Sequence, residues 1–269
     1  MKIGKMGAAA LVAGGIAAGV AGAVAARSSA KTCAVDERAT ADDEFTPSPQ
    51  RLARRHLVDR ENMQAVWDAK PKAYKAVKRI ADVTLSGAAL VVLSPVLAAT
   101  AIAIMVEDGR PVIYAAPREG QDGKPFKMYK FRSMSKDAES KLKDLLDQNE
   151  QYGAAFKIAD DPRITKVGRF IRKTSIDELP QLVNIVAGDM SIVGPRAIQK
   201  AREFTPYEAQ RLVAKPGLTC YWQVLGRSLI PWDDWVELDL DYIQDASIAT
   251  DVKLIAQTFE SVAKAIGAH

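Results

Sequence analysis

The sequence predicts an α+β fold that is predominantly helical, with a small β-hairpin and a membrane-associated part. Two apolar stretches, residues 6–26 and 83–106, are each long enough for a membrane helix, which needs ~20 apolar residues. Two short strand-like runs flank the turn signal "DGK" at residues 122–124 and predict the hairpin. Much of the remaining chain repeats its apolar residues with helical spacing. With 269 residues, the chain is long enough for one sizeable core plus appended segments.

Residues 1–30 contain the first apolar stretch, which is dominated by Ala and Gly. Its length favours a membrane helix, whereas Lys2, Lys5 and a small-residue site near Ala26 also suit a secretory signal peptide. Both interpretations stay open. The "GIAAG" run at residues 15–19 has the spacing of a helix-dimer motif, so a homodimer stays open as well.

Residues 31–70 are predicted to form a polar linker. They contain an acidic run, "DERATADDE", a run with two prolines, "TPSPQ", and a basic run, "RLARRH". This composition offers little apolar surface to bury, so we expect little packing against a core.

The second apolar stretch, residues 83–106, is interrupted in its middle by Ser94-Pro95. Pro95 cannot donate the helical hydrogen bond to the carbonyl of Val91, and its ring crowds that turn, so we expect the helix to bend there. Two shapes follow: a bent helix that crosses the bilayer, or one that dips in and returns to the face it entered. The residues alone favour crossing, because re-entrant segments are the rarer kind.

The chain is soluble in character after the second apolar stretch. Residues 111–116 and 125–131 are the predicted strands of the hairpin. Residues 137–152 space three leucines along one helical stripe, which predicts a helix that packs on the core or lies on a membrane surface. The C-terminal residues 232–266 predict two amphipathic helical segments that meet near residues 245–247.

A further helix is predicted over residues 163–173, with one apolar side and one cationic side. The apolar residues are Ile164, Val167, Phe170 and Ile171, and the cationic residues are Arg163, Lys166, Arg169 and Arg172. A solvated face beside a buried one is the ordinary explanation of such a pattern. Because the cations lead into Asp177 and Glu178, they would also attract an anion to these carboxylates and lower the pKa of both.

Asp177 and Glu178 stand next to each other in "TSIDELPQLVN", just before Pro180. One interpretation is helix capping, because acidic residues at a helix start accept hydrogen bonds from its free N–H groups, and Pro fits a first turn. The other interpretation is a functional pair. This segment alone does not decide between them.

Three turns place a cation beside glycine or proline. They are Gly194-Pro195-Arg196, Lys215-Pro216-Gly217 and Gly226-Arg227. A rigid turn that holds a guanidinium or an ammonium group suits phosphate recognition, although ordinary loops use the same residues.

The composition excludes several kinds of chemistry. The only histidines are His56 and His269, and the only cysteines are Cys33 and Cys220, so we expect neither Ser-His-Asp catalysis, nor a zinc site, nor a disulfide framework. No Walker or dinucleotide-binding glycine pattern is present. The net charge of +4 includes a cationic cluster between residues 124 and 172, which would attract phosphates or anionic lipid. We expect no nucleic-acid partner. The chemistry therefore belongs to carboxylates and to Arg or Lys.

From about Lys78 to Thr258 the chain resembles the bacterial sugar transferase family, the small monotopic phosphoglycosyl transferases. The matching motifs are a basic pair and an Asp before the Ser94-Pro95 break, "DGKPFKMYKFRSM", "DPRITKVGRFIRKTSIDELPQLVNIVAGDMSIVGPR", "KPGLTCYWQVLGR" and "LDLDYIQDASIATDVKLIAQT". They occur in the family's order, and the central block is too long for chance agreement.

The resemblance implies that a sugar-1-phosphate passes from a UDP-sugar to a polyprenyl (undecaprenyl) phosphate, with UMP released and Mg²⁺ required, as the start of surface glycan or exopolysaccharide assembly. It implies that Asp177 is the nucleophile that carries the phosphosugar, and that Glu178 binds the metal and handles a proton. A carboxylate that attacks a diphosphate approaches like charge, so cations have to neutralise the phosphoryl oxygens. The candidate substrate-binding residues are Arg132, Arg163, Arg169, Arg172, Lys173, Arg196, Lys215 and Arg227.

The resemblance also implies a membrane arrangement. Residues 71–108 would form a re-entrant helix, with Ser94 and Pro95 at the bend and Arg79 assigned to the same motif, which reverses the preference for crossing. Residues 109–269 would form a catalytic domain that faces the cytoplasm at the bacterial inner (plasma) membrane.

Three positions depart from the family pattern. The family has a Pro-Arg-Pro turn whose Arg, here Arg196, is associated with the nucleotide, but the second Pro is Ala197 in this chain. Cys220 and Leu225 replace a Gly and an Asn. The departures leave two alternatives open: a non-catalytic relative that binds nucleotide sugar or lipid phosphate and regulates a partner, and a lipid-phosphate hydrolase in which water replaces the acceptor.

Overall fold

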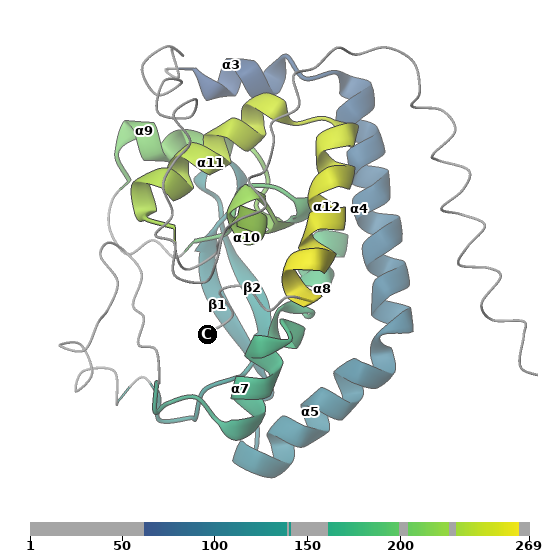
Figure 1. The fold of residues 1–269 in the computed structure, drawn as a ribbon, viewed down its shortest axis with the longest axis vertical. Coiled ribbons are helices and arrows are strands. Elements are labelled where there is room, and N and C mark those ends of the chain that lie inside the picture. Colours follow the sequence, from purple (N-terminus) through teal and green to yellow (C-terminus); the bar gives the residue numbers. More distant parts are fainter. Residues whose placement is uncertain (1–61, 139, 141–160, 199–203, 226–229, 264–269) are drawn as a thin grey trace, which may run out of the picture. The chain divides into compact units, whose positions relative to one another are not determined.

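The structure is a computed structural model, and it describes residues 62–138, 140, 161–198, 204–225 and 230–263 (Figure 1). Several predictions concern residues outside these ranges. They are the N-terminal apolar helix, the homodimer motif, most of the polar linker, the leucine stripe and Arg227.

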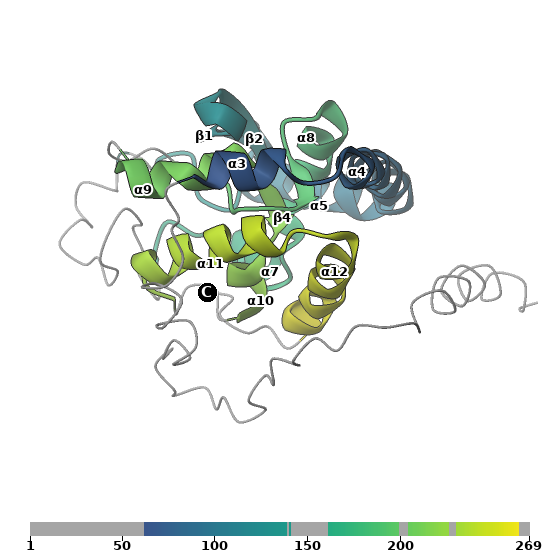
Figure 2. The same ribbon diagram turned by 90° about the horizontal axis from the view of Figure 1, so that it is seen from above.

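The first described helix, α3 (Met63–Asp68), lies where the sequence predicted linker. Asn62 caps it, since its Oδ1 accepts a hydrogen bond from the N–H of Ala65 at 2.9 Å. Met63 and Trp67 are buried, and the helix packs on α11 and η4, as Figure 2 shows for α11. The last residues of the predicted linker therefore belong to the fold, because their apolar side chains find partners far along the chain.

Helices α4 (Lys72–Val92) and α5 (Ser94–Asp108) form one bent arm (Figure 1). Their axes differ by 61°, and the break falls at Leu93, so the bend predicted at Ser94-Pro95 is confirmed. The hydroxyl of Ser94 donates to the carbonyl of Val91 at 2.8 Å. This is the carbonyl for which Pro95 has no N–H, so the serine supplies the missing donor.

None of the described helices is long and apolar enough by itself to cross a bilayer, but α4 and α5 reach that length and apolarity as a pair. Large apolar side chains stay exposed along this arm, including Val91, Val92 and Val106, the last of which is 82% exposed.

The predicted hairpin is confirmed. Strands β1 (Ile113–Glu119) and β2 (Pro125–Phe131) pair antiparallel, from Ile113 opposite Phe131 to Glu119 opposite Pro125. The short 3₁₀ turn η1 (Gln121–Gly123) joins them, and its Asp122 and Gly123 have positive φ, as a tight reversal of the chain requires.

Three short elements follow the hairpin: α7 (Lys166–Lys173), the 3₁₀ turn η3 (Ile176–Glu178) and α8 (Gln181–Ala187). Strand β3 (Ser191–Val193) then pairs in parallel with β4 (Gly217–Thr219) and forms a second small sheet. Neither Gly194 nor Gly217 has room for a side chain. A Cβ on Gly194 would lie 2.3 Å from the carbonyl oxygen of Lys215, and a Cβ on Gly217 would lie 2.1 Å from the backbone nitrogen of Gly194.

The C-terminal part is helical. It contains α9 (Pro206–Ala209), η4 (Gln210–Val213), α10 (Tyr221–Leu225), α11 (Trp232–Asp245) and α12 (Ile248–Ala263). The predicted meeting point near residues 245–247 is confirmed by the break between α11 and α12.

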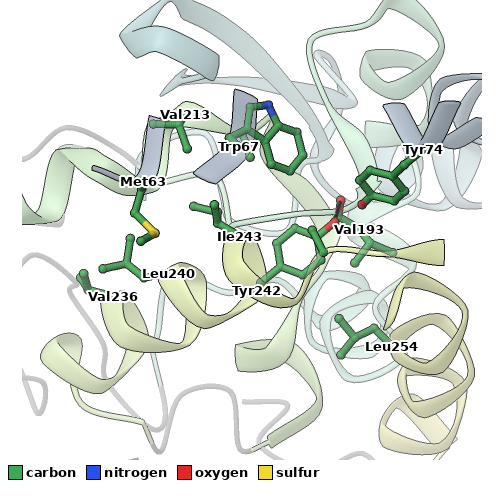
Figure 3. Close-up of a cluster of buried hydrophobic side chains, with 12 residues drawn as sticks. Met63, Trp67, Tyr74, Val193, Val213, Val236, Leu240, Tyr242, Ile243 and Leu254 are labelled. Carbon is green, nitrogen blue, oxygen red and sulfur yellow. Dashed lines mark hydrogen bonds between the residues drawn. The ribbon is translucent and has the colours of Figure 1, made fainter. Parts of the chain in front are cut away.

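The largest cluster of buried side chains joins α3, the start of α4, β3, α11 and α12 (Figure 3). Inside it, Asp251 of α12 accepts hydrogen bonds from Tyr74 and Tyr242, and Lys78 forms an ion pair with it at 2.9 Å. Tyr242 also donates to the carbonyl of Val193 at 3.2 Å. The core thereby fixes the end of β3, from which the Gly194-Pro195-Arg196 turn departs.

Candidate functional site

Asp177 and Glu178 lie in η3, the single turn that connects α7 to α8. Ser175, in a left-handed conformation with φ of 56°, redirects the chain after α7, and its carbonyl accepts from the N–H of Glu178. Helix α8 begins after Pro180, and no side chain caps it. The capping interpretation of the two acids is therefore wrong, and their carboxylates are available for other contacts.

Asn184, which is 1% exposed, holds α8 against the hairpin. Its Oδ1 accepts from the N–H of Tyr129 at 2.9 Å, and its Nδ2 donates to the carbonyl of Lys127 at 2.8 Å. The amide side chain of Asn184 thus forms hydrogen bonds with one main-chain N–H and one main-chain carbonyl of β2. This contact brings η3 beside Lys130 of the same strand.

Two cations hold Glu178. Its Oε1 accepts from Nζ of Lys130 and from Nη2 of Arg196, each at 2.9 Å. Burial alone would raise the pKa of Glu178, but the charges of Lys130 and Arg196 outweigh burial and hold that pKa far below its usual range. Glu178 is therefore ionised at any physiological pH.

Asp177 has the opposite environment. Among the described residues its carboxylate has no hydrogen-bond or ion-pair partner, although Lys130, Arg172 and Arg196 are near enough to act on its charge. Burial first, and then the charge of Glu178, raise the pKa of Asp177 to about 6 against these cations. The expectation that both pKa values are lowered is wrong for Asp177, because burial and the charge of Glu178 outweigh the three cations.

Arg196 is the residue that reaches Glu178 from the β3 side. Its guanidinium lies 4.5 Å from the ring centre of Trp222, and Nη1 donates to Oε1 of Gln223 at 3.1 Å. Arg172 of α7 approaches from the other side, and its Nε donates to the hydroxyl of Ser133 at 2.9 Å. The structure thus brings Arg172, Arg196, Asp177 and Glu178 together, as the sequence predicted.

Other predicted substrate-binding cations lie elsewhere. Arg163 precedes α7, where it forms a buried ion pair with Asp161 at 2.6 Å, so it does not belong to the predicted cationic side of that helix. Arg132 binds the end of α5. Its Nη2 forms an ion pair with the carboxylate of Asp108 at 2.8 Å and donates to the carbonyl of Gly109 at 2.8 Å. Structural partners therefore occupy both guanidinium groups.

Lys215 and Arg79 lie near the C-terminus of α8. Lys215 lines a pocket of about 220 Å³ together with Gly120, Gln121, Asp122, Lys124, Pro125, Phe126, Gly188 and Asp189, away from Asp177. Arg79 donates to the carbonyls of Ile185 and Val186 at 2.7 and 2.9 Å. Its guanidinium thus binds the free carbonyls that end α8, and its assignment to the membrane bend stays a prediction.

On α7, Arg169 and Lys173 are exposed, and so is Phe170, at 62%. Phe170 was predicted to face the core. Ile171 of the same predicted apolar side is buried, because Gly168 lies directly against the carbonyl of Ser133 and sets which side of this short helix is covered.

Lys130 is a site residue that was not predicted from the sequence. A signal was present: Lys130 follows the buried Met128 by two residues on β2, so both side chains leave the strand on the same face. A lysine at a core-facing strand position needs a buried anion as a partner, and here that partner is Glu178.

The site offers few ligands for a metal. Within the described ranges, no three His, Cys, Asp or Glu side chains are close enough together to hold an ion. Mg²⁺, however, is commonly held by one or two carboxylates with waters and substrate phosphates. Asp177 and the second oxygen of Glu178, which has no hydrogen-bond partner among the described residues, fit that donor set.

Comparison with known proteins identifies relatives. The chain is 44% identical to the galactosyl transferase CpsE of Streptococcus agalactiae over 194 residues, which is 71% of this chain and 43% of that protein. It is 38% identical to the UDP-glucose:undecaprenyl-phosphate glucose-1-phosphate transferase of Escherichia coli, over 68% of this chain and 39% of that protein. The match to the exopolysaccharide production protein ExoY of Sinorhizobium fredii is 36% identical and covers 71% of this chain and 88% of that protein.

The chain thus spans less than half of the length of the first two relatives and most of the length of the third. The family model described as bacterial sugar transferase matches residues 73–265, which include both carboxylates, Lys130 and Arg196. The chain belongs to the bacterial sugar transferase family.

Proposed function

We propose that the protein is a phosphoglycosyl transferase that moves a sugar-1-phosphate from a UDP-sugar to a polyprenyl phosphate and releases UMP. One observation carries the proposal: two adjacent carboxylates have opposite environments, Glu178 bound by two cations and Asp177 unbound among the described residues. The relatives support the substrate class, since the name of the Escherichia coli protein specifies UDP-glucose and undecaprenyl phosphate.

Asp177 is the nucleophile in the first half-reaction. One of its oxygens forms a bond to the sugar-bearing phosphorus of the UDP-sugar, the bond from that phosphorus to the bridging oxygen breaks, and the electron pair leaves with UMP. A pKa of about 6 leaves roughly nine-tenths of Asp177 ionised at pH 7. Because no hydrogen bond from the described residues stabilises this carboxylate, its oxygens are free to attack.

The second half-reaction returns the enzyme to its starting state. An oxygen of the polyprenyl phosphate attacks the same phosphorus, the bond between phosphorus and Asp177 breaks, and the carboxylate re-forms. The product is a polyprenyl diphosphate that carries the sugar. Arg172, Arg196 and Lys130 would oppose the negative charge that accumulates on the phosphoryl oxygens in both steps.

Glu178 would keep Lys130 and Arg196 in place and supply one oxygen to Mg²⁺. When bound, Mg²⁺ supplies further charge neutralisation at the diphosphate. The permanent charge of Glu178 also has a second effect, because it raises the pKa of its neighbour and so increases the basicity of the nucleophile.

We infer that the arm of α4 and α5 enters the cytoplasmic face of the bacterial inner membrane and returns to it. The 61° bend and the exposed valines near it support this arrangement. A polyprenyl phosphate presents its phosphate at the lipid surface, so Asp177 has to lie near the headgroups. The product would start the assembly of a surface glycan or exopolysaccharide.

The experiment is the release of UMP by purified, detergent-solubilised protein with Mg²⁺, undecaprenyl phosphate and a panel of UDP-sugars. We expect continuous UMP release with one sugar and the lipid acceptor, at most one UMP per protein molecule without the acceptor, and none from Asp177→Asn. Asp122→Asn, at the exposed hairpin turn, is the matched control and should keep full activity. No UMP from folded protein with any sugar would favour the non-catalytic relative, and a free sugar phosphate would favour the hydrolase.

A further inference from the structure

Arg211 of η4 and Asp239 of α11 form an ion pair in the interior of the protein. Their side chains are each 1% exposed, and neither residue is hydrogen-bonded to Asp177 or Glu178. A pair buried to this extent brings little net stability compared with apolar side chains of the same size. Its other contacts therefore indicate what it does.

Both polar groups of the Arg196 main chain bind this pair. The carbonyl of Arg196 accepts from Nη2 of Arg211 at 2.7 Å, and the N–H of Arg196 donates to Oδ1 of Asp239 at 3.4 Å. Nη2 of Arg211 is also the atom that pairs with Asp239. The ion pair thus holds one peptide segment from two sides.

The pair also reaches the side chain of Arg196, through stacked aromatic rings. The guanidinium of Arg211 lies 5.7 Å from the ring centre of Trp235, whose ring stacks on that of Trp222 at 4.7 Å. The guanidinium of Arg196 lies over Trp222 at 4.5 Å and donates from there to Glu178. The two stacked indole rings therefore lie between the guanidinium of Arg211 and the guanidinium of Arg196 in this series of contacts.

This chain needs such a restraint at Arg196 itself. The N–H of Gly217 donates to the carbonyl of Pro195 at 2.8 Å and fixes the residue before Arg196. The residue after it is Ala197, whose φ is not restricted by a ring as it would be in proline. The hydrogen bonds from Arg211 and Asp239 restrain the main chain between these two positions.

We propose that the Arg211–Asp239 pair is a positioning unit that fixes Arg196 for phosphoglycosyl transfer. Neither residue touches the substrate. They act through the main chain of Arg196 and keep its guanidinium between Trp222 and Glu178. The catalytic part of this proposal rests on the proposed function, whereas the restraint on Arg196 does not.

The test is the double variant Arg211→Met/Asp239→Leu, which replaces the ion pair with apolar side chains and removes both hydrogen bonds to Arg196. Hydrogen exchange of residues 194–198, measured without substrate, should become faster. The kcat/KM for UMP release should fall on the order of 10²-fold, as expected when a catalytic group is misplaced by about 1 Å. In an Arg196→Ala background the same double change should cause no further loss, because its effect passes through Arg196.

Lys70→Met is the matched control, since it also removes two hydrogen bonds to main-chain carbonyls, those of Gln244 and Ala246, but none to Arg196. Its kcat/KM should stay within about twofold of the wild type. If the double variant does not fold, Arg211→Lys keeps the charge for Asp239 without the guanidinium fork, and the same two results are expected.

Two results would overturn the proposal: unchanged exchange of residues 194–198, or equal losses of kcat/KM with and without Arg196. Absence of UMP release from the wild type would instead refute the proposed function. The exchange measurement would then still decide whether the ion pair restrains Arg196.

Discussion

Replacing Asp177, the proposed nucleophile, should make the protein inactive and more stable. Asp177→Asn removes a carboxylate whose pKa rises from its ordinary value of 3.8 to about 6 in the folded protein. A raised pKa means that the charged form is less stable in the fold than in the unfolded chain. The cost is absent well below pH 3.8 and is complete above pH 6, where about two pKa units correspond to ~3 kcal/mol.

The free energy of unfolding of Asp177→Asn should therefore exceed that of the wild type by up to ~3 kcal/mol at pH 8, and by well under ~1 kcal/mol at pH 4. Denaturant unfolding at both pH values measures the difference, and UMP release measures the loss of turnover. Asp122→Asn removes an exposed carboxylate and should change neither quantity. A variant that is less stable than the wild type at pH 8, or that is folded and still turns over, would refute the reasoning.

Three further predictions follow from the same site. Lys130→Met leaves Glu178 with Arg196 alone and should lower the free energy of unfolding by about 3 kcal/mol, as removal of one partner from a buried ion pair does. Lys127→Met, at an exposed neighbouring position, should lower it by less than about 0.5 kcal/mol in the same denaturation experiment. The rate of UMP release should rise through about pH 6 as Asp177 ionises. Lys130→Met should move this rise to higher pH, because it removes a charge that lowers the pKa of Asp177. A rise that stays at the same pH would show that another group causes it. Chelation of Mg²⁺ should abolish UMP release while the far-UV circular dichroism stays unchanged, and activity that survives chelation would exclude a metal role for Glu178.

The parts of the fold that were predicted correctly depend on local chemistry. The hairpin follows from "DGK" between two strand-like runs, and the bend at Pro95 follows from a missing N–H. Both are properties of a few consecutive residues. The parts that could not be predicted depend on distant partners: α3 forms where linker was expected because Met63 and Trp67 are covered by residues more than a hundred positions later.

The same distinction applies to the site. The adjacent acids and Arg196 could be found from sequence, because the motif that carries them is contiguous. The pKa of Asp177 could not, since it depends on the burial of Asp177 and on the charge of Glu178 beside it. Both follow from the packing of α8 on β2 through Asn184. Arg163 was predicted wrongly from its local spacing. That spacing placed it on the cationic side of α7, but Arg163 precedes the helix and pairs with Asp161 instead.

Glu107, in the last turn of α5, accepts hydrogen bonds from the first N–H groups of α7, those of Lys166 and Val167, at 2.8 and 2.9 Å. Helix α7 ends four residues before Asp177. If the arm lies in a bilayer as proposed, the depth of α5 determines the height of Asp177 above the lipid phosphates. Bilayer thickness would then be a variable of the reaction rate, and membranes of different acyl-chain length would tune one enzyme to different activities without any change in its substrate-binding residues.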